Sequence, residues 1–286
     1  MGKTSIEWAD AVYNPITGCT KVSPGCNHCY AEAIARRFQG RNGFPAFVPW
    51  TVAAQEKAGG SPITLHPERL EAPLHWKKPR RVFVNSMSDL FHEAVPFAFI
   101  SRVYSKMLEA SHHTYQILTK RPERALEWWR WHCWKGPGRP SYATLHKCVW
   151  LEVSVENQRY ADERIPVLAQ VPAAVRFLSC EPLLGPVDLR PWLNWCAVCH
   201  EPITHRVFHH SGASDHAWQP ALQWVIVGGE SGPHARPCDV KWIRDIVGQC
   251  REAGVPVFVK QLGAHSVSTV KADQIGRIKA GSEMGS

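Results

Sequence analysis

Three cysteines stand close together near the start of the chain, at Cys19, Cys26 and Cys29, with the spacing C-x6-C-x2-C. Thiolates are the protein ligands that soft metals and iron–sulfur clusters prefer. Three of them can hold three irons of a 4Fe–4S cluster and leave the fourth iron open. An open iron can chelate S-adenosylmethionine (SAM), and the reduced cluster can then split it into methionine and a 5′-deoxyadenosyl radical. The spacing therefore predicts a redox cofactor site.

The residues around these cysteines suit a bound cluster. Gly18 and Gly25 stand directly before the first two cysteines, which lets the backbone come close to a cluster. A helix expected over Tyr30–Gln39 directs its positive N-terminal end toward an anionic group. Two other interpretations stay open: a structural zinc site that adds His28 to the thiolates, and three core cysteines with no shared role.

The rest of the chain alternates short apolar runs with helical patterns, which predicts an α/β protein. Helices are expected over Tyr30–Gln39, Pro96–Ala110, Glu123–Trp131 and from an Asp239 cap to Gly254. Because the strands read as buried on both faces, we expect a parallel sheet in a partial or complete (β/α) barrel. One further strand is expected before the cysteines. The six predicted strands are Arg81–Asn85, Thr114–Leu118, Val149–Val153, Val175–Ser179, Gln223–Val227 and Val255–Lys260.

Each predicted strand ends in polar residues, and in such barrels the chemistry sits at the carboxyl ends of the strands. Six strands ending this way predict a lined cavity, although each residue alone can be a satisfied polar group at a strand end. The clusters are Ser86, Ser88 and Asp89; Thr119, Lys120 and Arg121; Ser154, Glu156 and Asn157; Ser179 and Glu181; Gly228, Gly229 and Glu230; and Lys260 and Gln261.

Two segments interrupt the alternation. Residues 44–73 are rich in proline, glycine and small residues and are expected to form an excursion or lid. Residues 193–221 are expected to be an insertion, in which Cys196, Cys199, His205 and His209 have the spacing of a zinc knuckle. A polar loop with coincidental histidines remains the alternative. The C-x-x-C-H run also matches haem attachment, which we set aside because no export signal is present.

The composition of the chain predicts the compartment in which the protein works and the class of its partner. Ten cysteines without a secretory signal, and no long apolar run, predict a cytoplasmic protein with no membrane partner. The formal net charge of +8 favours a polyanion such as nucleic acid, although a basic surface can serve solubility alone. We expect one barrel domain over residues 1–275, including the insertion, and a tail over 276–286.

Several stretches resemble one known family, the phage-associated three-cysteine family of radical-SAM-like proteins of phages and prophages. The matching stretches run over nearly the whole chain and include WADAVYNPITGCTKVSPGCNHCYAE, FVNSMSDLFH, ILTKRPER, RFLSCEPLLGP and WVIVGGESGPHARP. The resemblance implies a radical SAM barrel in a phage-infected or prophage-carrying bacterium, with flavodoxin or ferredoxin as electron donor. The commonest radical SAM spacing is C-x3-C-x2-C, from which this chain departs.

The resemblance also implies positions for the cofactor. In radical SAM barrels the amino group of SAM is held after the second strand, here at Ser86, Ser88 and Asp89. The residue between the last two cysteines, here His28, lies near the adenine, and Tyr30 follows the cluster loop. Ser154, Glu156 and Asn157 match positions that contact the ribose and methionine, and Gly228, Gly229 and Glu230 match the strand that lets the adenine approach the backbone.

The remaining candidates concern the substrate. Five basic residues are expected to meet a phosphate or carboxylate, with solvated surface charge or pairing with nearby glutamates as the alternative: Lys120, Arg121, Arg124, Arg236 and Lys260. The candidate catalytic residues are Lys120, Cys180, Glu181 and Lys260. Cys180 and Glu181 follow one predicted strand, where Cys180 could donate a hydrogen atom or act as a ligand, although packing explains it equally. With the phage-type family, these residues favour a modified nucleotide or DNA base, first of all a hypermodified thymidine in phage DNA that is rearranged or tailored. The alternatives are a thymine-lesion repair lyase resembling spore photoproduct lyase and a non-catalytic iron–sulfur or zinc protein that binds nucleic acid.

Overall fold

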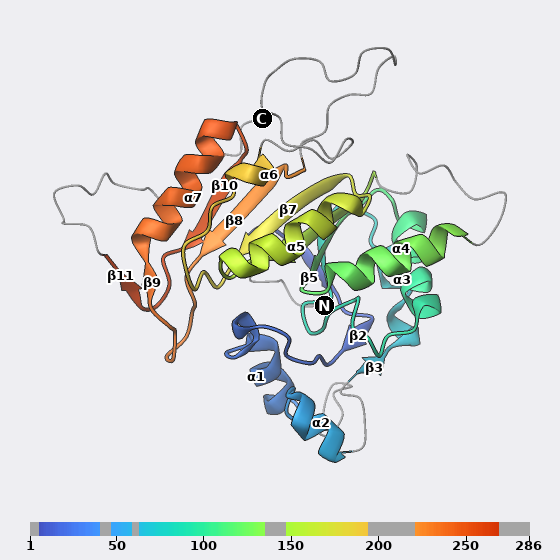
Figure 1. The fold of residues 1–286 in the computed structure, drawn as a ribbon. Helices are drawn as coiled ribbons and strands as arrows, with labels where there is room; N and C mark the ends of the chain where they lie inside the picture. The colour runs from blue at the N-terminus through green and yellow to red at the C-terminus, as the bar shows by residue number, and fades with distance from the viewer. Residues whose placement is uncertain (1–5, 41–46, 59–62, 135–146, 194–220, 269–286) are drawn as a thin grey trace, which may run out of the picture. The chain divides into compact units, whose positions relative to one another are not determined.

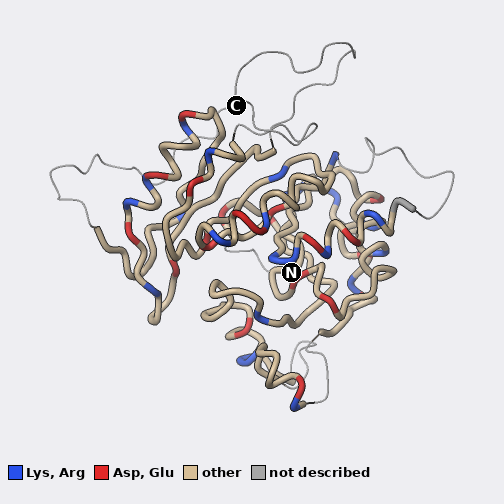
Figure 2. Tube along the Cα trace, in the orientation of Figure 1, with Lys and Arg blue, Asp and Glu red and all other residues tan. Residues whose placement is uncertain are grey.

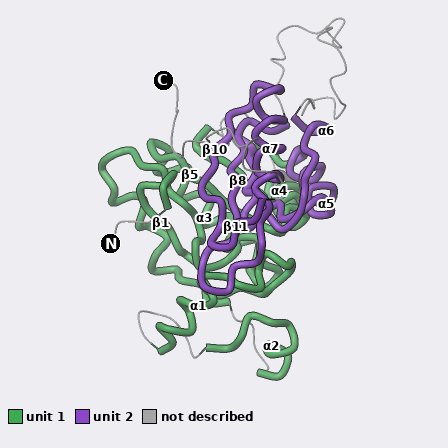
Figure 3. The backbone as a smooth tube through the Cα atoms, turned by 90° about the vertical axis from the view of Figure 1, so that its left-hand side faces the viewer, with its two compact units in different colours: residues 1–153, 171–174 green, residues 154–170, 175–286 purple. Residues whose placement is uncertain are grey.

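A computed structural model describes residues 6–40, 47–58, 63–134, 147–193 and 221–268. The chain divides into two compact units, which Figure 3 shows in different colours. Unit 1 comprises Met1–Val153 and Val171–Ala174, and unit 2 comprises Ser154–Gln170 and Val175–Ser286.

Unit 1 is built on parallel strands in the order β1-β4-β5-β6. The strands are β1 (Ala11–Tyr13), β4 (Arg81–Val84), β5 (Thr114–Thr119) and β6 (Val149–Ser154). Their side chains are largely buried, as expected for strands of a parallel sheet. Their carboxyl ends therefore face the same edge, where the residues after β4 and β5 meet.

Helices of unit 1 pack through aromatic and aliphatic side chains. The helix α3 (Phe97–Glu109) buries Ile100, Val103 and Met107 at helical spacing. It contacts α4 (Pro122–Trp134), which lies beside it in Figure 1. The ring centroids of Tyr104 in α3 and Trp128 in α4 are 5.1 Å apart. Pro122 begins α4, a position where its missing N–H costs no hydrogen bond.

A second, antiparallel pair of strands in unit 1 flanks the cysteines: β2 (Ile16–Thr17) pairs with β3 (Thr64–Leu65). The helix α1 (Tyr30–Arg37) follows the cysteines, and α2 (Val52–Ala58) precedes β3. The described part of the predicted excursion over residues 44–73 therefore carries a helix, a short strand, the whole 3-10 turn Pro67–Arg69 and the start of a second one, Ala72–His75.

Unit 2 has three parallel strands in the order β7-β8-β10, with α7 packed against β8 and β10. These are β7 (Val175–Cys180), β8 (Trp224–Gly228), β10 (Val257–Gln261) and α7 (Val240–Ala253). Asp239 accepts a hydrogen bond from the N–H of Lys241 at the start of α7, and Gly254 ends it with a φ of 69°. The other elements are α5 (Gln158–Gln170), α6 (Arg190–Leu193) and the pair β9 (Cys238–Asp239) with β11 (Ser266–Val267).

The predicted α/β class and the parallel pairing are confirmed in both units, and all six predicted strands and the strand before the cysteines are present. No helix among the described residues is long and apolar enough to span a membrane. A single barrel domain over residues 1–275 stays a prediction. Residues 194–220, which make up most of the predicted insertion, and the predicted tail lie outside the described residues.

Candidate functional site

The cysteine loop lies between β2 and α1, and both of its ends are tied to the segment that follows β4. At the first end, the N–H of Gly18 donates to the carbonyl of Met87 over 3.0 Å. Gly18 has a φ of 90°, which only glycine adopts readily. At the other end, the hydroxyl of Tyr30 donates to the carbonyl of Ser86 over 2.8 Å. The fold therefore holds the three cysteines beside the carboxyl end of β4.

The three cysteines are free thiols and each is partly exposed. Burial raises the pKa of Cys19 to about 12 and also raises that of Cys29, and the nearby Cys26 adds to both effects. Cys19 and Cys29 pack against a small apolar cluster made of Ala31, Ala35, Trp50 and Met87. Cys19 and Cys29 thus share one apolar base, and Cys26 lies near both of them.

Positive groups surround these sulfurs. The guanidinium of Arg121 points one N–H at Cys19 Sγ, with Nη1 3.8 Å from the sulfur. For Cys29, whose pKa stays raised overall, the backbone N–H groups of Glu32 and Ala31 in the first turn of α1, and then the ammonium of Lys120, offset part of the effect of burial. A helix N-terminus and two cations favour thiolates and an anionic group bound to them.

The loop fits an iron–sulfur cluster by donor type, partial exposure and surrounding positive charge. In the part of the chain that the structure describes, no set of three or more His, Cys, Asp or Glu side chains is already gathered as a metal site. Ligation needs thiolates, so binding would displace the thiol protons and draw the three sulfurs together. The predicted fourth zinc donor, His28, is exposed in the same loop.

The predicted SAM-contacting residues after β4 differ in how many hydrogen bonds they already form with other protein groups. Ser86 bonds the side chain of Asn14 over 3.1 Å, and Ser88 donates to the carbonyl of Ile16 over 3.0 Å. Asp89 is buried, and four donors occupy its carboxylate: the N–H groups of Phe91 and Lys120, the hydroxyl of Thr119 and the guanidinium of Arg121. Asp89 therefore organises the ends of β4 and β5, whether or not it also touches a cofactor.

In unit 2, the predicted residues after β6 are built around a buried ion pair. Glu156 is fully buried, and its carboxylate accepts a hydrogen bond from Arg164 Nη1 over 2.9 Å. The same nitrogen donates to the carbonyl of Ser154 over 2.7 Å. Asn157 stands at the start of α5, where its side chain accepts from the N–H of Tyr160. Arg164 thus fixes this strand end.

Gly228 and Gly229 have a packing role inside unit 2. A Cβ on Gly229 would lie 2.5 Å from the carbonyl oxygen of Leu262, and one on Gly228 would lie 3.1 Å from that of Gln261. Glu230 accepts from the backbone N–H and the side chain of Arg236. The close approach of Gln261 at the end of β10, and of Leu262 after it, therefore gives both glycines a packing role, and their predicted contact with adenine stays a prediction.

The predicted catalytic residues of unit 2 also have partners. Lys260 Nζ lies 2.8 Å from the carboxylate of Glu181, which accepts a further hydrogen bond from Gln261 over 3.0 Å. Cys180 ends β7 with no exposed surface. Arg121, Arg236 and Lys260 pair with nearby carboxylates, as the alternative interpretation allowed, and their contact with a substrate stays a prediction.

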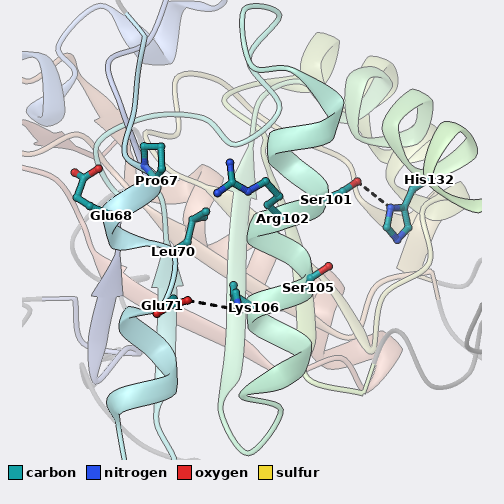
Figure 4. A pocket seen from close by; sticks show the side chains of 9 residues that line it. All are labelled: Pro67, Glu68, Leu70, Glu71, Ser101, Arg102, Ser105, Lys106 and His132. Atoms are coloured by element: carbon teal, nitrogen blue, oxygen red, sulfur yellow. Dashed lines mark hydrogen bonds and ion pairs between the residues drawn. The ribbon is translucent and has the colours of Figure 1, made fainter.

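A cavity of about 420 Å³ in unit 1 is lined by none of the residues predicted as catalytic, cofactor-binding or metal-binding. Figure 4 shows it between α3 and the 3-10 turns before it, with Arg102 and Lys106 on one side. Lys106 lies 4.0 Å from Glu71 across the cavity, and Ser101 bonds His132 over 2.9 Å. Its two basic residues face two acidic ones, Glu68 and Glu71, so its lining charges balance.

Two organising residues were not predicted in these roles. Arg121 was predicted as a contact for a substrate phosphate or carboxylate, and the structure shows that it joins the cysteine loop to Asp89. Arg164 was not singled out at all. Position in the chain does not reveal either role, because both depend on contacts made across the fold. The predicted zinc ligands Cys196, Cys199, His205 and His209 lie outside the described residues.

The chain belongs to a family described as "Protein of unknown function (DUF5131)", whose model matches residues 3–285. The comparison with curated proteins and the comparison with solved structures each gave no match.

Proposed function

We propose that this protein is a radical SAM enzyme in which Cys19, Cys26 and Cys29 bind a 4Fe–4S cluster. The observation that carries the proposal is the cysteine loop itself. Three partly exposed thiols are anchored beside the carboxyl end of β4, next to Arg121, Lys120 and the N-terminus of α1. Few other roles call for three thiols, a positive environment and access from outside in one loop.

The protein's own residues have defined tasks in this proposal. The three thiolates hold the cluster, and Arg121 and Lys120 offset its negative charge. When bound and reduced, the cluster supplies the electron that splits SAM into methionine and a 5′-deoxyadenosyl radical. Ser86 and Ser88, beside the loop, offer hydroxyls to the amino group of SAM, and exposed His28 and Tyr30 offer ring surfaces to its adenine.

For the substrate we propose a nucleic acid base, first of all a hypermodified thymidine in phage DNA. The formal net charge of +8 supports a polyanionic partner. Figure 2 shows that acidic residues are interspersed with the basic ones along the elements of each unit, so the charge favours contact without marking one binding face. A base in duplex DNA would have to be flipped out before a radical could reach it.

Product analysis tests this substrate. The reconstituted, reduced protein is incubated anaerobically with SAM and phage DNA that carries amino-acid-modified thymidine, and the nucleosides are separated and weighed by mass spectrometry. We expect a new or isomeric nucleoside that forms only with SAM. Release of ordinary thymidine from ultraviolet-irradiated DNA would instead favour a repair lyase. DNA binding with both substrates unchanged would favour a non-catalytic role.

A further inference from the structure

Arg121 is a buried arginine at the centre of the contacts around the cysteine loop. Only 5% of its side chain is exposed. Its Nε bonds the carboxylate of Glu93 over 2.9 Å and its Nη1 bonds that of Asp89 over 3.2 Å. Burying a guanidinium is costly unless carboxylates neutralise it, and here two of them do. The position of the guanidinium is therefore set firmly by unit 1.

The remaining donors of Arg121 face the cysteine loop. Nη2 donates to the carbonyl of Thr20 over 3.0 Å, and Nη1 lies 3.8 Å from Cys19 Sγ. One side chain thus contacts both the backbone of the loop and one of its sulfurs. A planar guanidinium can reach all these acceptors at once, whereas the ammonium of a lysine is a single point of charge.

Asp89 explains why the guanidinium is aimed this way. Its carboxylate accepts from the hydroxyl of Thr119 over 2.8 Å and from the N–H of Lys120 over 3.1 Å, which ties it to the end of β5. The chain Thr119–Asp89–Arg121–Cys19 is a continuous set of hydrogen bonds from the sheet to the sulfur. Such chains orient the ligands of metal sites.

We propose that Arg121 is a positioning residue that holds the Cys19 end of the loop and raises the reduction potential of the cluster bound there. The inference rests on the proposed function, since it concerns the same cluster. A reduced cluster carries one more negative charge than an oxidised one. A cation that donates a hydrogen bond to one of its sulfur ligands stabilises the reduced form more and raises the potential.

The test compares Arg121→Met and Arg121→Lys with the native protein after anaerobic reconstitution with iron and sulfide. Arg81→Met is the control, because Arg81 belongs to the same unit but pairs with Asp10 on the surface. Three quantities are measured: iron and sulfide per chain, iron lost to a chelator, and the midpoint potential from a redox titration followed by electron paramagnetic resonance.

For Arg121→Met we expect a more negative midpoint potential and about 10-fold weaker retention of iron, the usual size of effect when a group bonded to a metal ligand is removed. Arg121→Lys keeps the positive charge but loses the planar guanidinium with its several donors. We therefore expect its midpoint potential to lie between those of the native protein and Arg121→Met, and its iron retention to stay below that of the native protein. Arg81→Met should match the native protein. If Arg121→Met shows no cooperative unfolding in a thermal melt, and so is not folded, the potential and iron retention of Arg121→Lys alone test the inference.

Two failures can be told apart. Native potential and native iron retention in both Arg121 variants would overturn the inference and leave the cluster in place. A native protein that takes up no iron and sulfide would overturn the proposed function, and this inference with it.

Discussion

Cys26→Ala is expected to leave the protein with background iron after anaerobic reconstitution and to lower SAM cleavage by at least about 100-fold. Cys26 stands in the middle of the loop, near both Cys19 and Cys29. Two thiolates hold a 4Fe–4S cluster poorly, and without it no electron reaches SAM. The measurement is the iron and sulfide content per chain, together with the absorption at roughly 400 nm that thiolate-bound clusters show.

Cys250→Ala is the matched control for this loss. Cys250 is fully buried in α7 of unit 2 and belongs to no predicted site. Its replacement removes one sulfur from the core, at a cost of about 1 kcal/mol in the free energy of unfolding. Iron uptake should stay native. Equal iron content in both variants would mean that the loop does not hold the cluster.

Gly229→Ala is expected to lower the free energy of unfolding by about 3 kcal/mol, near the upper end for overpacking. The new methyl group would meet Gly263 Cα at 2.8 Å and the Leu262 carbonyl carbon at 2.9 Å, besides the oxygen of Leu262 at 2.5 Å. These are backbone atoms, which cannot move aside as a flexible side chain would. Equilibrium denaturation in urea, read as a change in midpoint at constant slope, gives the value.

Gly248→Ala provides the opposite control in the same unit. Gly248 lies inside α7, and a Cβ there meets nothing within 4 Å. Alanine favours a helix interior over glycine, so this change should raise stability by about 0.5–1 kcal/mol. A Gly229→Ala protein as stable as the native one would show that Leu262 and Gly263 do not pack closely on the residue that follows β8.

The elements that could be predicted are those with local signals. Asp239 and Gly254 mark the two ends of α7 in the sequence, and both act as expected. The strands stand out as short apolar runs, accurate to within one or two residues. The helix α5 was not predicted, because Pro166 inside it removes a backbone donor and breaks the usual helical pattern. Tertiary packing overrides that local preference.

In the candidate site, too, features with a local sequence signal could be predicted and those that depend on contacts across the fold could not. The cysteines are visible from type and spacing alone, and so is the segment Ser86–Asp89 that lies beside them. The role of Arg121 could not be predicted, because its partners Asp89 and Thr20 are 32 and 101 residues away along the chain. Gly228 and Gly229 suggested a cofactor contact, yet the backbone at the end of β10 and directly after it packs closely on them, which only the fold reveals.

Cleavage of SAM decides whether the protein is a radical SAM enzyme. The protein is reconstituted anaerobically with iron and sulfide, reduced with dithionite and given SAM, and 5′-deoxyadenosine is measured by chromatography with mass detection. We expect four irons per chain, by the cluster's formula, and 5′-deoxyadenosine that depends on both reduction and Cys26. Zinc bound by Cys19, Cys26 and Cys29, with no iron–sulfur cluster and no 5′-deoxyadenosine, would contradict it.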